Sequence, residues 1–253
     1  MQIVSYMQTE QDWLPAWLGV RYLKLLRAFH WRPFTVAEAR EALSEDKLRA
    51  GLVLHELCRR GWALRLARGW YVVLSPHAQL VRGAWEGEVR QPEYLPVIVA
   101  AATRFLELLS GDLVSVAVYG SVARGEARAT SDLDLLVVSE RLPSSYPARA
   151  KLAVAALNPL RDLKLWLWEN RGLYCNVEAL MLTRAEASAT QPIYLDMLNA
   201  SIIVYDRGSF LRAVLARLSE KLSRMGAERV ALPSGGWFWR LKPRVERGEV
   251  VEL

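Results

Sequence analysis

Two aspartates in the middle of the chain have the type and spacing of metal ligands. Asp132 and Asp134 open the segment DLDLLVVS, whose apolar residues favour a β-strand. Side chains alternate between the two faces of a strand, so we expect both carboxylates on one face and Leu133 and Leu135 on the other. Two carboxylates so placed repel each other, and a hard divalent cation such as Mg²⁺ relieves that repulsion. The pair therefore predicts a magnesium site at the start of a strand.

A glycine and a serine precede this pair, at the end of another strand-like run. Gly120 and Ser121 follow LVSVAVY. Glycine lets the backbone turn sharply and approach a ligand closely. A helix that starts at Ser121 would offer free N–H groups, a positive dipole end and a hydroxyl to a phosphate. Phosphate contacts beside a carboxylate pair are what two-metal phosphoryl transfer requires.

The stretch GSVARGEARATSDLDLLVV resembles the nucleotidyltransferases of the DNA polymerase beta superfamily, above all their minimal bacterial and archaeal members. Their signature is a Gly-Ser pair followed, at this spacing, by Asp-x-Asp within apolar residues. The resemblance covers residues 96–206. It implies Mg²⁺-dependent transfer of a nucleoside monophosphate from a nucleoside triphosphate (NTP) to an acceptor hydroxyl, with release of pyrophosphate. It also implies that Asp132 and Asp134 hold two metal ions and that Gly120 and Ser121 hold the phosphates.

Three further positions belong to this site, the first of them through the resemblance. The family usually has a third carboxylate on a later strand, and here the candidate is Glu178 in YCNVEALML, although many relatives have Asp there. It implies that Glu178 is a metal ligand or the base that accepts the proton of the acceptor hydroxyl. Arg124 lies between the two halves of the motif, where it can face the triphosphate. Ser131 is expected to order the turn before the first aspartate.

The elements that must position these residues form an α/β (α+β) fold, with a small mixed sheet flanked by helices. We place this catalytic domain at residues 96–206, after a linker at 79–95. Residues 207–253 are expected to form a C-terminal helix and a tail whose aromatic cluster, WFWR from Trp237, either packs on the body or stacks bases.

Residues 1–78 have the pattern of a winged helix-turn-helix. Three helical patterns precede two short strand patterns that meet at Arg68–Gly69, and Thr35 with Glu38 forms a capping-box sequence before the second helix. Such modules enter the major groove of DNA in some proteins and mediate dimerisation or docking in others. Both roles stay open, so nucleic acid and a homodimer are both candidate partners.

Composition and charge limit the class of protein. Residues 1–78 carry 11 Lys and Arg against 7 Asp and Glu, and residues 207–253 carry 10 against 5. Basic ends of this kind suit phosphates or a solvated surface. The two cysteines have no ligand spacing and exclude a disulfide framework. Because we find no signal peptide or membrane-spanning run, we expect a cytoplasmic protein without membrane contact.

Two alternatives stay open at this point. The chain can be a DNA-binding regulatory or antitoxin-like module, paired with a small helical protein partner, since some minimal nucleotidyltransferases resemble antitoxin components. As an enzyme it can use a small molecule, a protein or an RNA 3′ end as acceptor, and the sequence does not name the preferred NTP.

Overall fold

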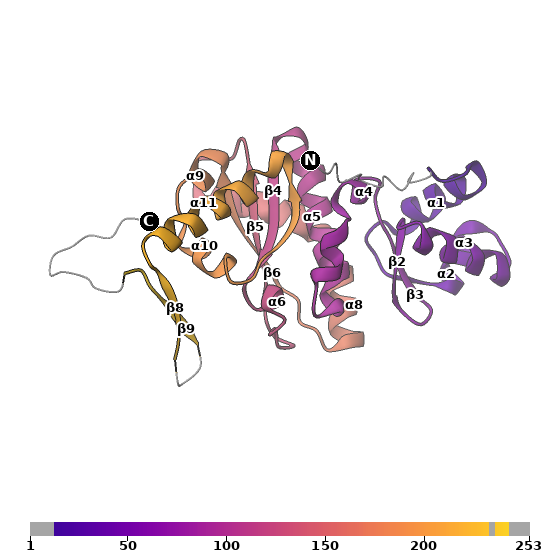
Figure 1. Ribbon diagram of the computed structural model, residues 1–253. Helices are drawn as coiled ribbons and strands as arrows, with labels where there is room; N and C mark the ends of the chain where they lie inside the picture. The colour runs from indigo at the N-terminus through magenta and orange to yellow at the C-terminus, as the bar shows by residue number, and fades with distance from the viewer. Residues whose placement is uncertain (1–12, 233–235, 243–253) are drawn as a thin grey trace, which may run out of the picture.

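We describe a computed structural model, which covers residues 13–232 and 236–242 (Figure 1). Its N-terminal part contains three helices and a three-stranded antiparallel sheet with strand order β1-β3-β2. The Thr35 side chain accepts a bond from the Glu38 N–H, and the Glu38 carboxylate accepts one from Thr35, so the predicted capping box is present. The elements are α1 (Ala16–Phe29), β1 (Phe34–Thr35), α2 (Val36–Leu43), α3 (Lys47–Arg59), β2 (Ala63–Ala67) and β3 (Trp70–Val73).

The segment that we predicted as a linker is built from short helical turns that pack on the rest of the molecule. It contains α4 (Ala78–Val81), η1 (Ala84–Glu88) and η2 (Pro92–Tyr94). Trp85 and Tyr94 are buried, and the Tyr94 hydroxyl donates to the backbone oxygen of Arg128 at 3.1 Å. One hydrophobic cluster runs through this segment and includes residues on both sides of it, so the predicted division into domains stays a prediction.

The central sheet has four strands in the order β6-β5-β4-β7. β4 pairs antiparallel with β5 and with β7, while β5 and β6 are parallel. The predicted small mixed sheet is therefore confirmed. Its strands are β4 (Leu113–Tyr119), β5 (Leu133–Ser139), β6 (Val177–Thr183) and β7 (Ile202–Asp206).

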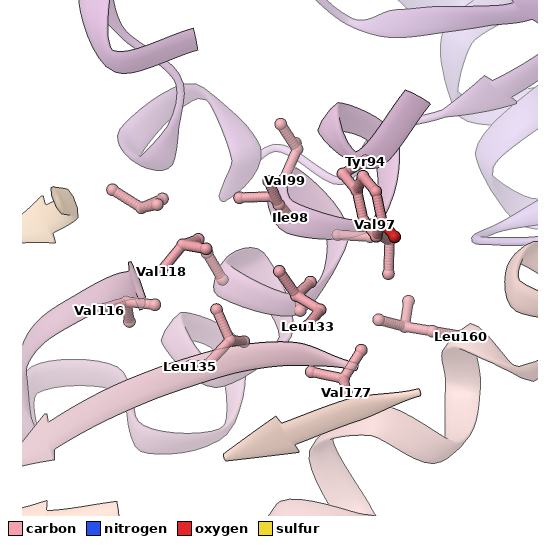
Figure 2. Close-up of a cluster of buried hydrophobic side chains, with 14 of the residues drawn as sticks. Tyr94, Val97, Ile98, Val99, Val116, Val118, Leu133, Leu135, Leu160 and Val177 are labelled. Carbon is pink, nitrogen blue, oxygen red and sulfur yellow. The ribbon is translucent and has the colours of Figure 1, made fainter. Parts of the chain in front are cut away.

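Helices cover both faces of this sheet. On one face, Val116 and Val118 of β4 and Leu135 of β5 pack against Ile98 of the central helix, and Figure 2 shows this cluster from the strands to the helix. On the other face, Leu136 belongs to a second cluster. The alternation follows from the period-two geometry of strands. The helices of the first face are α5 (Leu95–Leu109), α7 (Tyr146–Leu157) and α8 (Arg161–Arg171), and those of the second are α9 (Arg184–Ser188), α10 (Pro192–Met197) and α11 (Phe210–Arg224).

Short elements connect these layers. The predicted break in the helix near residue 158 is η4 (Asn158–Leu160), and η3 (Ser110–Asp112) and η5 (Arg207–Ser209) precede β4 and α11. The segment Pro92–Asp112 is long and apolar enough to cross a membrane by length and composition. Most of α5 within it is buried against the sheet, as expected of a core helix.

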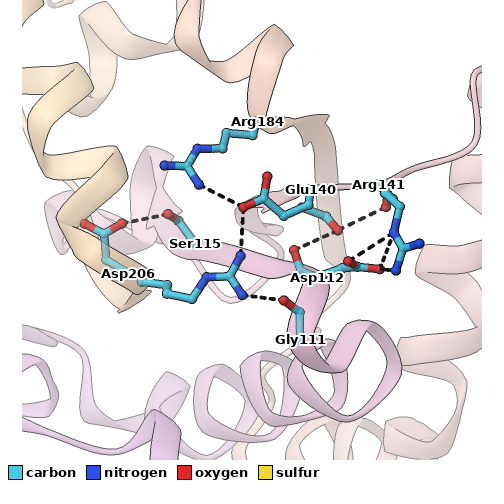
Figure 3. Close-up of polar contacts among 9 residues, drawn as sticks. Gly111, Asp112, Ser115, Glu140, Arg141, Arg184 and Asp206 are labelled. Carbon is cyan, nitrogen blue, oxygen red and sulfur yellow. Dashed lines mark hydrogen bonds and ion pairs between the residues drawn. The ribbon is translucent and has the colours of Figure 1, made fainter.

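A network of polar contacts lies at the end of the sheet that is remote from the predicted site (Figure 3). Glu140, directly after β5, accepts from Arg184 and from Arg207, each at 2.8 Å. Asp206 is nearly fully buried; it accepts from the Ser115 hydroxyl at 2.7 Å and from the Leu211 N–H at 2.9 Å. These contacts join β4, β5 and β7 to the starts of α9 and α11 at this end of the sheet.

The last elements that the structure describes are the strands of a hairpin, β8 (Glu228–Ala231) and β9 (Trp237–Arg240), which extends away from the body in Figure 1. Trp239 packs against the second cluster, and its indole N–H donates to the Leu195 oxygen at 3.2 Å. Phe238 remains 43% exposed. Of the predicted tail, residues 243–253 lie outside the described residues.

Candidate active site

The corner between β4 and the next helix is the first feature of the candidate site. Gly120 begins α6 (Gly120–Arg124) with a φ of 69°, in the left-handed region. A Cβ at this position would overlap the Oδ2 atom of Asp134. Only glycine therefore fits here, because it tolerates the positive φ and leaves room for the carboxylate. The start of α6, with half-buried Ser121, is thereby held against Asp134.

Strand pairing brings the predicted carboxylates together. In the sheet, Asp134 lies opposite Tyr119 on β4 and opposite Glu178 on β6. Leu133 and Leu135 belong to the cluster on the other face of the sheet, as predicted. Asp134 and Glu178 alternate with those residues and therefore share the face that α10 covers. Asp132, two residues before Asp134, is half-buried.

Negative charge accumulates at this point. Burial and the charges of Glu178, Asp132 and Asp196 raise the pKa of the Asp134 carboxyl to about 6. Burial and the charges of Asp134, Glu178 and Asp196 raise the pKa of the Tyr119 hydroxyl to about 12. Each carboxylate makes it harder for its neighbour to ionise, so the group as a whole favours a bound cation.

Arg124 is a cation whose charge acts on this group. Its Nη1 lies 2.9 Å from both carboxylate oxygens of Asp196 on α10, and its Nε donates to Glu126 at 2.9 Å. Its charge partly offsets the rise in the Asp134 pKa. The Arg90 guanidinium donates to the backbone oxygen of Arg124 at 3.1 Å, which anchors the C-terminal end of α6.

Comparisons with known proteins agree with this arrangement. Residues 100–183 match the family described as "Nucleotidyltransferase domain". A protein of Methanocaldococcus jannaschii named "Putative protein adenylyltransferase" is 31% identical over 116 residues, which are 45% of this chain and 73% of the relative. The chain belongs to the nucleotidyltransferase family.

Two solved structures match less well. One is a toxin–antitoxin with AMP-PNP, at 14% identity over 50% of this chain and 90% of that chain, with a TM-score of 0.32. The other is a mutant of the toxin–antitoxin MntA-HpeT, at 13% identity over 49% and 90%, also with a TM-score of 0.32. Scores this low carry no argument about this nucleotidyltransferase.

The matched segment of this nucleotidyltransferase contains Gly120, Asp134 and Glu178, whereas Asp196 lies beyond its end. Sequence reasoning missed both Asp196 and Tyr119. Asp196 reaches the site on a short helix far along the chain, where nothing local distinguishes it from a surface aspartate. Tyr119 is the last residue of a buried strand, a position where an aromatic residue usually belongs to the core.

Oxygen donors set the kind of metal that this nucleotidyltransferase could hold. Asp132, Asp134 and Glu178 supply carboxylates, but among the residues that the structure describes no three His, Cys, Asp or Glu side chains are grouped closely enough to form a metal site by themselves. Mg²⁺ is commonly held by one or two carboxylates together with substrate phosphates and water. The donor set therefore fits an ion that arrives with a triphosphate.

Hydrogen bonds order the turn that precedes Asp132. The Ser131 hydroxyl accepts from the Arg128 N–H at 2.9 Å, which orders the turn before Asp132 as predicted. Tyr94 anchors the same turn through the Arg128 backbone oxygen. The turn is thus held in place from both sides.

Proposed function

We propose that this nucleotidyltransferase moves a nucleoside monophosphate from an NTP to an acceptor hydroxyl on a protein, releasing pyrophosphate, with Mg²⁺ as cofactor. The observation that carries the proposal is the register of the sheet, which sets Asp134 directly beside Glu178 while Gly120 touches Asp134. The name of the M. jannaschii relative supports a protein as acceptor and ATP as donor.

The metal site of the proposal consists of Asp132 and Asp134, with Glu178 as a third ligand or as the base. The raised pKa of Asp134 and the charges around it are those of a site that gains from a cation. When bound, Mg²⁺ would offset the charge of the triphosphate and of the departing pyrophosphate. The chain itself supplies the carboxylates and holds them in register.

The phosphates are assigned to Gly120 and Ser121. The first N–H groups of α6 have no partners within the helix, and the Ser121 hydroxyl adds one more donor. Arg124 is proposed to exchange its contact with Asp196 for the triphosphate, because a phosphate and a carboxylate compete for the same guanidinium face.

Chemistry at the acceptor is assigned to Glu178. The acceptor oxygen forms a bond to the α-phosphorus, and the bond from that phosphorus to the pyrophosphate oxygen breaks. Glu178 is exposed and lies next to Asp134, so it is placed to take the proton of the attacking hydroxyl.

We assign residues 1–78 to a separate, non-catalytic role as a winged helix. Its helix α3 exposes Leu48 and Leu52, while Arg49 and Arg59 form ion pairs with Glu45 and Glu56. Exposed leucines and neutralised arginines suit a protein surface better than the DNA backbone. We therefore propose that this part of the chain docks another protein. The alternative, a DNA-binding regulatory module, requires DNA binding that is sensitive to salt.

Incubation with each labelled NTP, Mg²⁺ and a cell extract, followed by identification of the labelled product, tests the proposal. A labelled protein in the extract, whose labelling is abolished by EDTA, supports the proposal. A shift assay with DNA at several salt concentrations is the companion experiment. Specific DNA binding without any turnover of NTP would favour the regulatory module instead.

A further inference from the structure

A pocket of about 600 Å³ opens beside the candidate active site, between α7 and strand β6. Glu178 and Tyr119 are part of its wall, so the pocket is continuous with the carboxylate group. Its other lining residues come from the start of α7 and from β6: Tyr146, Arg149, Ala150, Ala153, Ala179, Leu180, Met181 and Leu182.

One wall of this pocket is an unpaired strand edge. β6 is the outermost strand of the sheet, and within the described part of the chain it pairs only with β5. The Leu133 N–H donates to the Asn176 oxygen at 2.7 Å, which fixes the register of the parallel pair. Backbone groups alternate in direction along a strand, so those of residues 176, 178, 180 and 182 face β5 and those of residues 177, 179, 181 and 183 face outward.

The outward groups are capped at one end of β6 and open at the other. The Met181 oxygen accepts from the Arg149 guanidinium at 3.1 Å, and the Thr183 N–H donates to Glu186 at 2.7 Å. Among the described residues, no side chain forms a hydrogen bond with the backbone N–H or C=O of Ala179. The open part of the edge therefore adjoins Glu178.

The charges around the pocket distinguish between acceptors. Arg149 is the one cation among the residues that line it, and both of its terminal nitrogens are bonded to Glu186, at 2.8 and 2.9 Å. Glu178 lines the pocket, and Asp134 lies beside it in the sheet, so this wall carries acidic side chains. A nucleic acid would bring further negative charge to this wall, whereas an uncharged or basic polypeptide would not.

We propose that the acceptor is a polypeptide segment that binds in extended conformation along the open edge of β6, by strand addition. Its backbone would pair with the N–H and C=O of Ala179, as in other complexes in which a peptide extends a sheet. The segment is uncharged or basic, and the inference rests on the proposed function of the same site.

Strand pairing also selects which residue of the segment reacts. A residue directly opposite Glu178 has its side chain on the same face of the sheet as the Glu178 carboxylate. A serine or threonine there presents its hydroxyl oxygen to the α-phosphorus and its proton to Glu178. The new bond joins that oxygen to phosphorus, and pyrophosphate leaves with the electrons of the broken bond.

The test uses the full chain, labelled ATP, Mg²⁺ and a library of uncharged or basic peptides, each with a single serine or threonine. RNA oligonucleotides with a free 3′ hydroxyl and small polyols are assayed in parallel. A labelled peptide is then remade with a methyl group on one backbone nitrogen at a time. We expect methylation at alternate positions to lower labelling about fivefold to tenfold, because only alternate N–H groups face β6.

Two variants at one position provide a second readout. Ala179→Pro removes the outward N–H, and Ala179→Gly keeps it, so labelling of peptides is expected to fall further in the proline variant. If labelling is lowered equally by a methyl group at every position, or at none, the proposal of strand addition is overturned. Labelling of RNA or polyols but of no peptide would overturn the polypeptide acceptor and leave the proposed transfer standing. No pyrophosphate release with any acceptor would overturn both.

Discussion

Asp134 is the carboxylate on which the other negative charges of the site act. Partial burial, followed by the charges of three other carboxylates, raises its pKa to about 6, while Arg124 acts in the opposite direction. The folded protein therefore carries a repulsion that the unfolded chain lacks. Clustered groups with such shifted pKa values are common at functional sites, and the function that we propose for this one is to hold a cation with a triphosphate.

The first prediction concerns the stability of the metal-free protein. Asp134→Asn removes the charge and should stabilise the fold at pH 7 by about 1–2 kcal/mol, a value reduced for the partial exposure of the side chain. The folded pKa is raised, so the folded state holds the proton more tightly and its stability falls as the pH rises from about 4 through about 6. The gain should therefore vanish near pH 4.

Urea unfolding in EDTA at both pH values is the measurement. Glu169→Gln, at an exposed position on α8, serves as the control and should change little at either pH. Equal destabilisation of Asp134→Asn at both pH values would contradict the electrostatic account.

Gly120 gives the second prediction. Gly120→Ala forces a Cβ into the Asp134 carboxylate and a positive φ on alanine, so we expect a stability loss of about 1–3 kcal/mol and a roughly hundredfold loss of rate. Gly172→Ala is the matched control, because Gly172 also has a positive φ, of 63°, but nothing within 4 Å of its Cβ position. It should cost about 1 kcal/mol and leave the rate unchanged. Equal losses of rate in the two variants would refute the packing argument.

At the scale of elements, local pattern was sufficient for most of the catalytic fold. Three features are local properties of the sequence. They are the apolar runs that form β4 and β5, the glycine between strand and helix, and the alternation that puts Asp134 and Leu135 on opposite faces of the sheet. The resemblance predicted Glu178 as a third carboxylate on a later strand, and the structure sets it opposite Asp134. What local pattern could not supply was Asp196, because α10 reaches the site only through tertiary packing.

The segment between residues 79 and 95 shows the same limit. Its glycines and proline indicate a loose connection, yet Trp85 and Tyr94 are buried within it. Hydrogen bonds to the neighbouring turn, such as that from the Tyr94 hydroxyl, depend on contacts far along the chain. Composition predicts a break in regular structure there, but it does not predict packing.

Glu186 gives the element-scale prediction. It caps α9 at Thr183 and bonds the Arg149 guanidinium of α7, and these contacts lower its pKa to about 2. Glu186→Gln should destabilise the protein at pH 7 by about 1 kcal/mol, discounted because the carboxylate is partly exposed. The folded pKa is lowered, so the wild-type advantage should be lost as the pH falls from about 4 to about 2.

Thermal unfolding across this pH range would measure the effect. The matched variant is Glu220→Gln, which breaks the exposed pair with Arg224 on α11 and should cost at most a few tenths of a kcal/mol. A loss at pH 7 no larger than that of Glu220→Gln would show that α7 and α9 do not depend on this contact.

At the scale of the whole molecule, the N-terminal part has a hydrophobic cluster of its own and also contributes residues to the cluster around α5. Trp31 and Leu66 belong to the same hydrophobic cluster as α5. Trp70 of β3 packs on Trp166 of α8 at a ring distance of 5.7 Å, and the Arg171 guanidinium donates to the Leu66 oxygen at 2.7 Å. These contacts tie the proposed docking module to the enzyme.

These shared contacts predict a single unfolding transition. Hydrogen exchange followed separately in α2 and β5 should give coincident midpoints, because unfolding of either part exposes the cluster to which both contribute. A lower midpoint for residues 1–78 than for the sheet would show that the two parts are energetically independent.

We propose that the carboxylates on neighbouring strands, beside the corner at Gly120, form the site of nucleotidyl transfer. The rate of pyrophosphate release by Asp134→Ala, with its circular dichroism spectrum as a check of the fold, tests it most directly. The account predicts a folded protein whose rate has dropped to background. A folded variant that releases pyrophosphate at the wild-type rate would contradict it.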